Sequence, residues 1–393
     1  MKKYVTVFAS FIIMLCVGSI YAWSMIASEL IKDHGFSAFQ SQVIFACILA
    51  FFPISMIIVG RLSKKIMFRT IGYISGILFF AAYFIGGFSQ GNFIVILLGL
   101  GVLGGTATGF GYWVSLTAPV QWFPDKKGLI TGIAAAGFGL GAIFMSKIGQ
   151  TVLANGNDVL HFLKTVGILY GLIIIVLSNL IFQVSSPGKK TVTEAPAIKP
   201  LLRTIKFKKL FFGLFLGTFA GLMIIGSLKI IGEHHSISVP YLVLGISLYA
   251  VSNFLGRLIW GYLSDGIGAN LSIFLALLVQ SVSIMLLIMI PLTDISYLIL
   301  AFFIGFGFGG NFVLFAKETA EYFGVEHLGH VYPYVFLGYA IAGIAGPMSG
   351  GLLYDLSGNF IYAISLASLM SLAGGLLFLR EFLKHKRLQS IDS

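Results

Sequence analysis

The chain has 393 residues, of which 58% are hydrophobic and only 10% charged, and its formal net charge is +11. Soluble domains are about one quarter charged, and a soluble fold of this length could not remove so much apolar surface from water. The composition excludes an ordinary soluble protein and favours an all-α integral membrane protein with the lipid bilayer as its main partner.

The first apolar run extends from Tyr4 to about Ala27, and no A-x-A cleavage site follows it. It is too long for the core of a signal peptide, so we interpret it as the first membrane span. A span needs roughly 20 apolar residues. The sequence predicts twelve such spans, at about 4–27, 41–59, 70–88, 93–119, 128–150, 163–183, 210–231, 240–263, 271–291, 296–315, 331–351 and 359–379.

Most of the 25 basic residues fall on one side of the predicted membrane, in alternate gaps between the spans. They include Lys317 and seven basic residues spread over the gap after the sixth span. Because cytoplasmic loops carry an excess of Lys and Arg, we expect both termini in the cytoplasm and the protein in the inner (plasma) membrane. The same reasoning excludes a nucleic-acid partner, since the positive charge does not gather on a soluble face.

The longest polar stretch divides the chain into halves. We expect an N-terminal six-helix bundle at 1–183, a cytoplasmic linker at 184–209, a C-terminal six-helix bundle at 210–380 and a cytoplasmic tail at 381–393. The loop sequence Gly60-Arg-Leu-Ser-Lys64 in the first half is echoed by Gly261-Tyr-Leu-Ser-Asp265 in the second. Such repeats are typical of transporters that alternate access about a central site.

Glycines recur at helical spacing in the fourth span, at Gly101, Gly105 and Gly109, and in the tenth at Gly305 and Gly309. One stretch also fits the dinucleotide fingerprint, but that motif needs a preceding strand and an aqueous crevice. Close helix packing is the better interpretation.

The sequence shows no nucleophile, metal-ligand or nucleotide-binding motif, so we expect no enzyme activity, no metal and no cofactor. No Asp or Glu is expected deep inside a span. Arg257 is the exception among charged residues, because it lies well inside the eighth apolar run. An arginine near the centre of a membrane helix costs roughly 2.5–3.5 kcal/mol.

Tyr249, Asn253 and Arg257 are spaced i, i+4, i+8 and form one polar stripe on that helix. A planar guanidinium can hold a carboxylate through two hydrogen bonds, so the stripe indicates an anion site. Snorkelling of Arg257 to the interface is the alternative. Lys229, near the other end of the seventh span, is interpreted as snorkelling, with a second cation of the site as the alternative. Tyr21, Tyr112 and Tyr339 lie inside spans and offer an apolar face and a hydroxyl to a ligand.

The whole chain resembles the major facilitator superfamily, through the Gly261–Asp265 loop sequence and its first-half copy. In that copy Lys64 stands where an Asp is usual, which leaves the loop's charge role in the first half open. More narrowly, the chain resembles the oxalate/formate antiporter branch, which is related to monocarboxylate carriers. The segments that carry this resemblance are Gly18-Ser-Ile-Tyr-Ala-Trp23, Gln121-Trp-Phe-Pro-Asp-Lys-Lys-Gly128, Ala136-Gly-Phe-Gly-Leu-Gly141 and Asn253-Phe-Leu-Gly-Arg-Leu-Ile-Trp-Gly261.

The resemblance implies an anion-binding arginine at Arg257, with Asn253 beside it. It implies an aromatic cage at Tyr21, Tyr112, Phe138, Phe308, Phe312 and Phe336. Oxalate carriers of this branch have a second cation where this chain has Tyr339, which favours a monoanion. Proton-coupled relatives have a Lys and an Asp where this chain has Met25 and Asn253, so that coupling route is absent.

The sequence thus predicts a monomeric secondary transporter of a small monocarboxylate such as pyruvate, lactate or formate, working with a proton or a counter-anion. Three alternatives stay open. They are a carrier of oxalate or another dicarboxylate, a transporter-like membrane sensor, and an efflux pump for apolar compounds, against which Arg257 argues.

Overall fold

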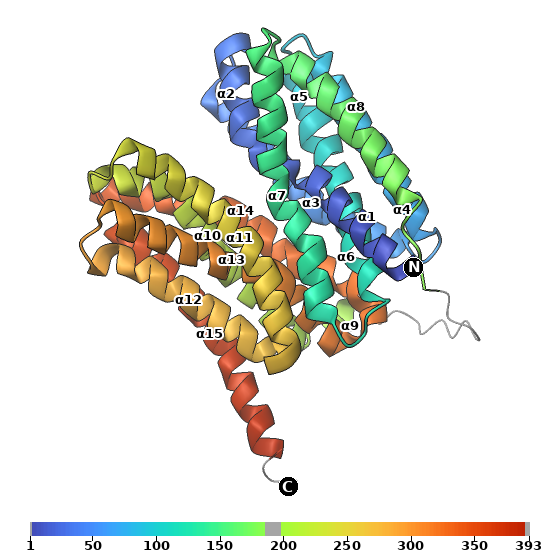
Figure 1. The fold of residues 1–393 in the computed structure, drawn as a ribbon. Helices are drawn as coiled ribbons and strands as arrows, with labels where there is room; N and C mark the ends of the chain where they lie inside the picture. Colours follow the sequence, from blue (N-terminus) through green and yellow to red (C-terminus); the bar gives the residue numbers. More distant parts are fainter. Residues whose placement is uncertain (1, 185–197, 390–393) are drawn as a thin grey trace. The chain divides into compact units, whose positions relative to one another are not determined.

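The computed structural model describes residues 2–184 and 198–389, and in these ranges the regular structure is helical (Figure 1). Twelve of the described helices are long and apolar enough to cross a membrane, which confirms the predicted number of spans. The chain forms two compact units by its internal contacts. The first runs to Pro124 and resumes at Ile133, and the second contains Asp125–Gly132 together with the helices from Ile198 onward.

The first unit contains the helices of the N-terminal half, two of which depart from α-helical geometry. The first span is interrupted by the 3-10 turn η1, and the fourth contains the π-helical segment η2. The elements are α1 (Lys2–Val17), η1 (Gly18–Ala22), α2 (Trp23–His34), α3 (Ala38–Leu62), α4 (Phe68–Gly87), α5 (Phe93–Ile96), η2 (Leu97–Gly104), α6 (Gly105–Val120), α7 (Lys127–Ala154) and α8 (Val159–Ser178).

The second unit contains longer helices. Several are near 30 residues, or about 45 Å at 1.5 Å per residue, so they exceed the roughly 30 Å hydrocarbon core. The elements are α9 (Ile198–Leu202), α10 (Ile205–His234), α11 (Val239–Ile267), α12 (Ala269–Met289), α13 (Asp294–Phe323), η3 (Val325–His327), α14 (Leu328–Ser357) and α15 (Ile361–Gln389).

The segment expected as a linker, 184–209, is only partly described. Residues 185–197 lie outside the described residues, and the rest holds α9 and the first turn of α10. Helix α10 begins at Ile205, before the apolar run expected at 210, because the Thr204 hydroxyl accepts the Phe207 N–H and caps the helix. A cap satisfies one orphan donor of the first turn, so the helix starts among lysines that a hydropathy scan excludes.

The tenth span differs more from expectation. Helix α13 continues to Phe323, although the apolar run appeared to end at 315. Lys317, expected in a loop, and Glu318 therefore lie inside the helix, where they are 4% and 0% exposed. The expectation that spans hold no buried acidic residue is wrong at Glu318. The helix continues because its charged side chains find polar partners, described below.

The glycine pattern has the packing role that its spacing predicts. A Cβ at Gly101, Gly105 or Gly109 would meet atoms of α3 at 3.1 Å or less. At Gly309 it would lie 2.3 Å from the Asn253 carbonyl oxygen, so α13 approaches the backbone of α11 there. This close contact sets the spacing of the two helices that carry the site.

Gly309→Ala should therefore destabilise the protein, by about 1–3 kcal/mol for an overpacked site, since the neighbouring atom is backbone and cannot rotate away. Gly351→Ala is the control, because that helical glycine has open space around the position of its Cβ. The stability of the Gly351→Ala variant should match or exceed that of the wild type, because alanine favours helix over glycine by up to about 1 kcal/mol. Unfolding midpoints in detergent compare the two, and equal midpoints would contradict the close approach.

Candidate functional site

The polar stripe on α11 faces the interior of the second unit. Tyr249, Asn253 and Arg257 are 4%, 7% and 0% exposed, and α11 packs along α13. Complete burial excludes the snorkelling interpretation of Arg257. Its side chain must therefore be stabilised by groups of the protein.

Neutral groups are among the partners of the Arg257 guanidinium. Its Nε donates a hydrogen bond of 3.0 Å to Asn253 Oδ1, one helical turn away. Its Cζ lies 4.2 Å from the centroid of the Phe312 ring. A hydrogen bond to a charged group contributes about 1.5–3 kcal/mol, and a desolvated cation–π contact about 2 kcal/mol. Together they offset much of the cost of burial while leaving the positive charge in place.

Phe312 is the centre of the aromatic part of this site. Its ring centroid lies 5.2 Å from Phe308, 6.4 Å from Phe336 and 5.4 Å from Tyr339. Phe336 and Tyr339 are themselves 4.9 Å apart. Helical spacing produces this arrangement, since Phe308 and Phe312 lie four apart on α13, and the other two lie three apart on α14.

The structure thus brings together six of the predicted site residues around one buried cation, from α11, α13 and α14. We call this set the Arg257 cluster, and it consists of Asn253, Arg257, Phe308, Phe312, Phe336 and Tyr339. Within it Asn253 and Phe312 contact Arg257, and the other three side chains contact Phe312. A guanidinium and aromatic side chains are the groups that a small anion with an apolar body would need.

The other three predicted aromatic residues contact one another within the first unit. Phe138 on α7 lies 5.3 Å from Tyr21 in η1 and 5.2 Å from Tyr112 on α6, between ring centroids. Phe52 on α3 completes this cluster, 5.1 Å from Tyr112. Sequence reasoning missed Phe52, which is one of 37 phenylalanines with no polar atom to distinguish it.

The sequence suggests Lys229 as a second cation, but its observed contact is with another residue of α10. Its side chain is 58% exposed and its Nζ lies 3.6 Å from Glu233 Oε1, one turn further along α10. Its suggested role as a second cation stays a prediction.

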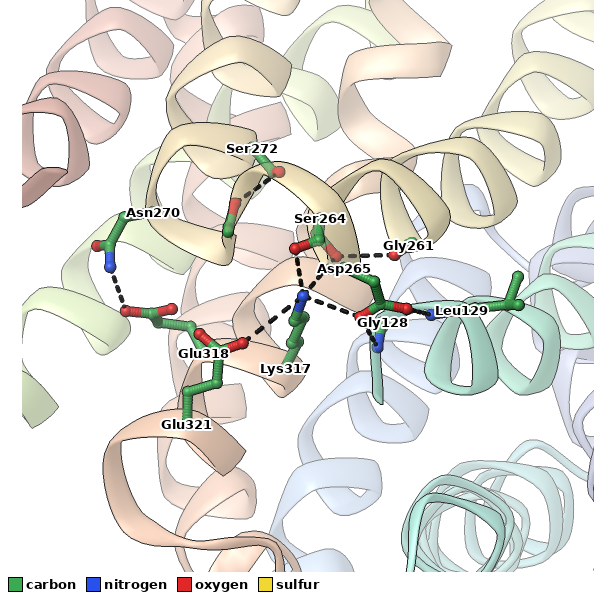
Figure 2. A network of polar contacts seen from close by, with 11 residues as sticks. Gly128, Leu129, Gly261, Ser264, Asp265, Asn270, Ser272, Lys317, Glu318 and Glu321 are labelled. Carbon is green, nitrogen blue, oxygen red and sulfur yellow. Dashed lines mark hydrogen bonds and ion pairs between the residues drawn. The ribbon is translucent and has the colours of Figure 1, made fainter. Parts of the chain in front are cut away.

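A second polar site lies at the end of α11, where Asp265 accepts two backbone N–H groups from the first turn of α7. The bonds from Gly128 and Leu129 are both 2.9 Å (Figure 2). Carboxylates are stabilised at the N-terminus of a helix by its free amides and dipole. The dipole of α11 disfavours a carboxylate at the C-terminal end of that helix, where Asp265 lies. The positive N-terminal end of α7 compensates this effect.

Lys317 connects Asp265 to α13. Its Nζ lies 2.9 Å from Asp265 Oδ1 and 3.6 Å from Glu321 Oε1, and it also bonds Ser264. Figure 2 shows these contacts converging on the ammonium. The adjacent Glu318 accepts a 2.8 Å hydrogen bond from Asn270 Nδ2. Sequence reasoning missed Lys317 and Glu318, although acids three and four residues from a basic residue signal helical ion pairing.

Removing either partner of the Lys317–Asp265 pair should be costly, since Lys317 is buried and Asp265 half-buried, and the remaining charge would lose its partner. Lys317→Met and Asp265→Asn should each destabilise by up to about 3–5 kcal/mol, and the double variant should lose less than the sum. Thermal unfolding in detergent measures this coupling. Lys32→Met, at an exposed pair with Glu29, is the control and should change stability by at most about 1 kcal/mol. Additive losses at Lys317 and Asp265 would show that the pair is not coupled.

The fold agrees with that of known transporters. Over 96–97% of its length, the chain superposes on two solved structures at 13–14% sequence identity. They are the fucose:proton symporter FucP of Escherichia coli (98% of that chain, TM-score 0.71) and a bacterial homologue of the iron transporter ferroportin (99%, TM-score 0.75).

Three proteins illustrate its sequence relatives. It is 25% identical to the uncharacterized MFS-type transporter YhjX of Escherichia coli K12, over 87% of this chain and 86% of that protein. It is 28% identical to the oxalate:formate antiporter of Oxalobacter formigenes, over 67% and 63%. It is 24% identical to apicoplast pyruvate carrier 1 of Toxoplasma gondii, over 60% and 55%.

These relatives are consistent with the oxalate/formate antiporter branch. The sequence model of the Major Facilitator Superfamily matches residues 6–347 and 210–391. The chain therefore belongs to the Major Facilitator Superfamily and is a multi-pass membrane transporter, with twelve candidate spans in its described residues.

Proposed function

We propose that the protein transports a small monocarboxylate, such as pyruvate, lactate or formate, by alternating access, with Arg257 binding the carboxylate. The observation that carries this proposal is the complete burial of Arg257 between a neutral amide and an aromatic ring. A buried guanidinium fixed in orientation matches the planar, bidentate geometry of a carboxylate. The names of two relatives, an oxalate:formate antiporter and a pyruvate carrier, support the substrate class.

A monoanion fits the Arg257 cluster better than a dianion. The contacts of Phe312 place Tyr339, a neutral side chain, in the same cluster. A second substrate charge would enter a poorly solvated environment without a matching cation, which is costly. Oxalate stays the second candidate, because the oxalate:formate antiporter is among the relatives.

The proposal also covers the orientation of the chain in the membrane and its oligomeric state. Both termini lie in the cytoplasm because the basic residues gather on that side, the protein acts as a monomer, and the membrane is the plasma membrane.

Arg257→Lys should lose most of the uptake of labelled pyruvate into proteoliposomes, because an ammonium cannot reproduce two parallel hydrogen bonds. We expect a fall of at least ten-fold, since roughly 1.4 kcal/mol of lost anion binding suffices for that. The control is Arg69→Lys, because Arg69 likewise donates a hydrogen bond and lies over an aromatic ring, but belongs to the first unit. Wild-type uptake by folded Arg257→Lys protein would exclude the proposed role.

Competition against labelled pyruvate tests selectivity. Lactate and formate should compete, and oxalate should need a concentration at least about ten-fold higher, because burying an unmatched charge costs more than 1.4 kcal/mol. Tyr339→Lys should shift the preference toward oxalate, and Tyr241→Lys, a tyrosine outside the cluster near the start of α11, should not. Equal competition by oxalate in the wild type would overturn the preference for monoanions.

Coupling should run through anion exchange. The buried Glu318 could take up a proton, but it lies six residues beyond Phe312 on α13, or about 9 Å along the axis, and its hydrogen bond goes to Asn270. Asn253, beside Arg257, cannot titrate. Preloading proteoliposomes with unlabelled pyruvate should therefore accelerate labelled uptake, and Glu318→Gln should retain this acceleration. Strong pH-driven accumulation in empty vesicles, without stimulation by internal substrate, would contradict exchange.

A further inference from the structure

An apolar groove lies in the second unit, between α9, the start of α10 and α14. Its cavity volume is about 300 Å³, and it is lined mainly by aromatic and aliphatic side chains. Phe207, Phe211 and Phe212 form its α10 wall, and Tyr334 and Leu337 form the wall from α14. Phe212 is 52% exposed on a helix that qualifies as a membrane span, so this side of the groove is a lipid-facing surface.

The charged member of the groove lining is Lys208, which is exposed at the first turn of α10. Leu202 of α9 also lines the groove, and exposed Lys199 and Arg203 lie within three residues of it. Two neighbouring lysines are engaged elsewhere, since Lys209 pairs with Glu381 and Lys206 lies over the Tyr322 ring. The groove therefore combines an apolar interior with one exposed lysine at the end of a membrane span, and two more exposed basic residues lie close to its Leu202 in the sequence. We call Lys208, Lys199 and Arg203 the basic rim.

We propose that this groove binds an anionic phospholipid, with an acyl chain against the phenylalanines and the headgroup phosphate at Lys208 and Arg203. Charge complementarity identifies the occupant. A neutral lipid would leave the basic rim without a role, and a free phosphate would leave the apolar groove without one. Aromatic and basic side chains are the usual anchors at a membrane interface, and basic groups there attract anionic lipid headgroups.

The test is lipid retention by the full-length protein, measured by native mass spectrometry after exchange into micelles that contain equal phosphatidylglycerol and phosphatidylcholine. The wild type should retain phosphatidylglycerol preferentially. Lys208→Gln should lower that preference about five-fold, the change expected for one interfacial basic residue. Lys229→Gln is the control, since it removes an exposed lysine from the far end of the same helix and should leave the preference intact.

A second variant tests the acyl-chain part. Leu337→Trp should fill the groove and reduce retention of both lipids, without a change in the charge of the rim. Equal retention of the two lipids by the wild type, or equal losses in Lys208→Gln and Lys229→Gln, would overturn the proposal. Displacement of the lipid by soluble glycerol phosphate alone would show instead that only a phosphate site exists. Full retention by folded Leu337→Trp protein would exclude the groove as the acyl-chain site.

Discussion

The buried charge of Arg257 is the constraint on which the second unit depends. Taking a guanidinium out of water costs several kcal/mol even after the protein relaxes, and this residue has no exposed surface. The hydrogen bond to Asn253 lies within α11, and the ring of Phe312 on α13 adds its contribution only if α11 and α13 approach closely. Gly309 permits that approach at the Asn253 carbonyl. The stabilisation of the buried cation therefore depends on the small residue that lets the two helices pack closely.

The same two helices carry a second buried cation that is stabilised differently. Lys317 lies between the carboxylates of Asp265 and Glu321, and Asp265 also caps the first turn of α7. Its charge is matched within the protein, which is the arrangement of a structural site. At Arg257 the contacts with Asn253 and Phe312 are made by neutral groups, and they fix the direction of the guanidinium. The two buried cations on α11 and α13 thus differ in these contacts, and the proposed ligand-binding role concerns Arg257 alone.

The sequence was most informative where one physical pattern dominated. Runs of apolar residues predicted all twelve spans, and the i, i+4, i+8 stripe placed Tyr249, Asn253 and Arg257 on a buried face. It was misleading at Lys317 and Glu318, because a hydropathy scan stops at charges and cannot see the partners Asp265 and Asn270 some fifty residues earlier. Phe52 was missed because the sequence carries no signal for it at all. Its place in the aromatic cluster depends only on which rings the fold brings beside it.

Direct binding to the purified protein tests the central claim, that the Arg257 charge recognises a carboxylate. Calorimetry would compare pyruvate with pyruvamide, which has nearly the same shape but no charge, in the wild type and in Arg257→Gln. The wild type should bind pyruvate at least about ten-fold more tightly than pyruvamide, since a charge-assisted pair contributes more than 1.4 kcal/mol over a neutral one. Arg257→Gln should lose this discrimination. Equal discrimination by the two proteins would contradict the account, because the carboxylate would then be recognised elsewhere.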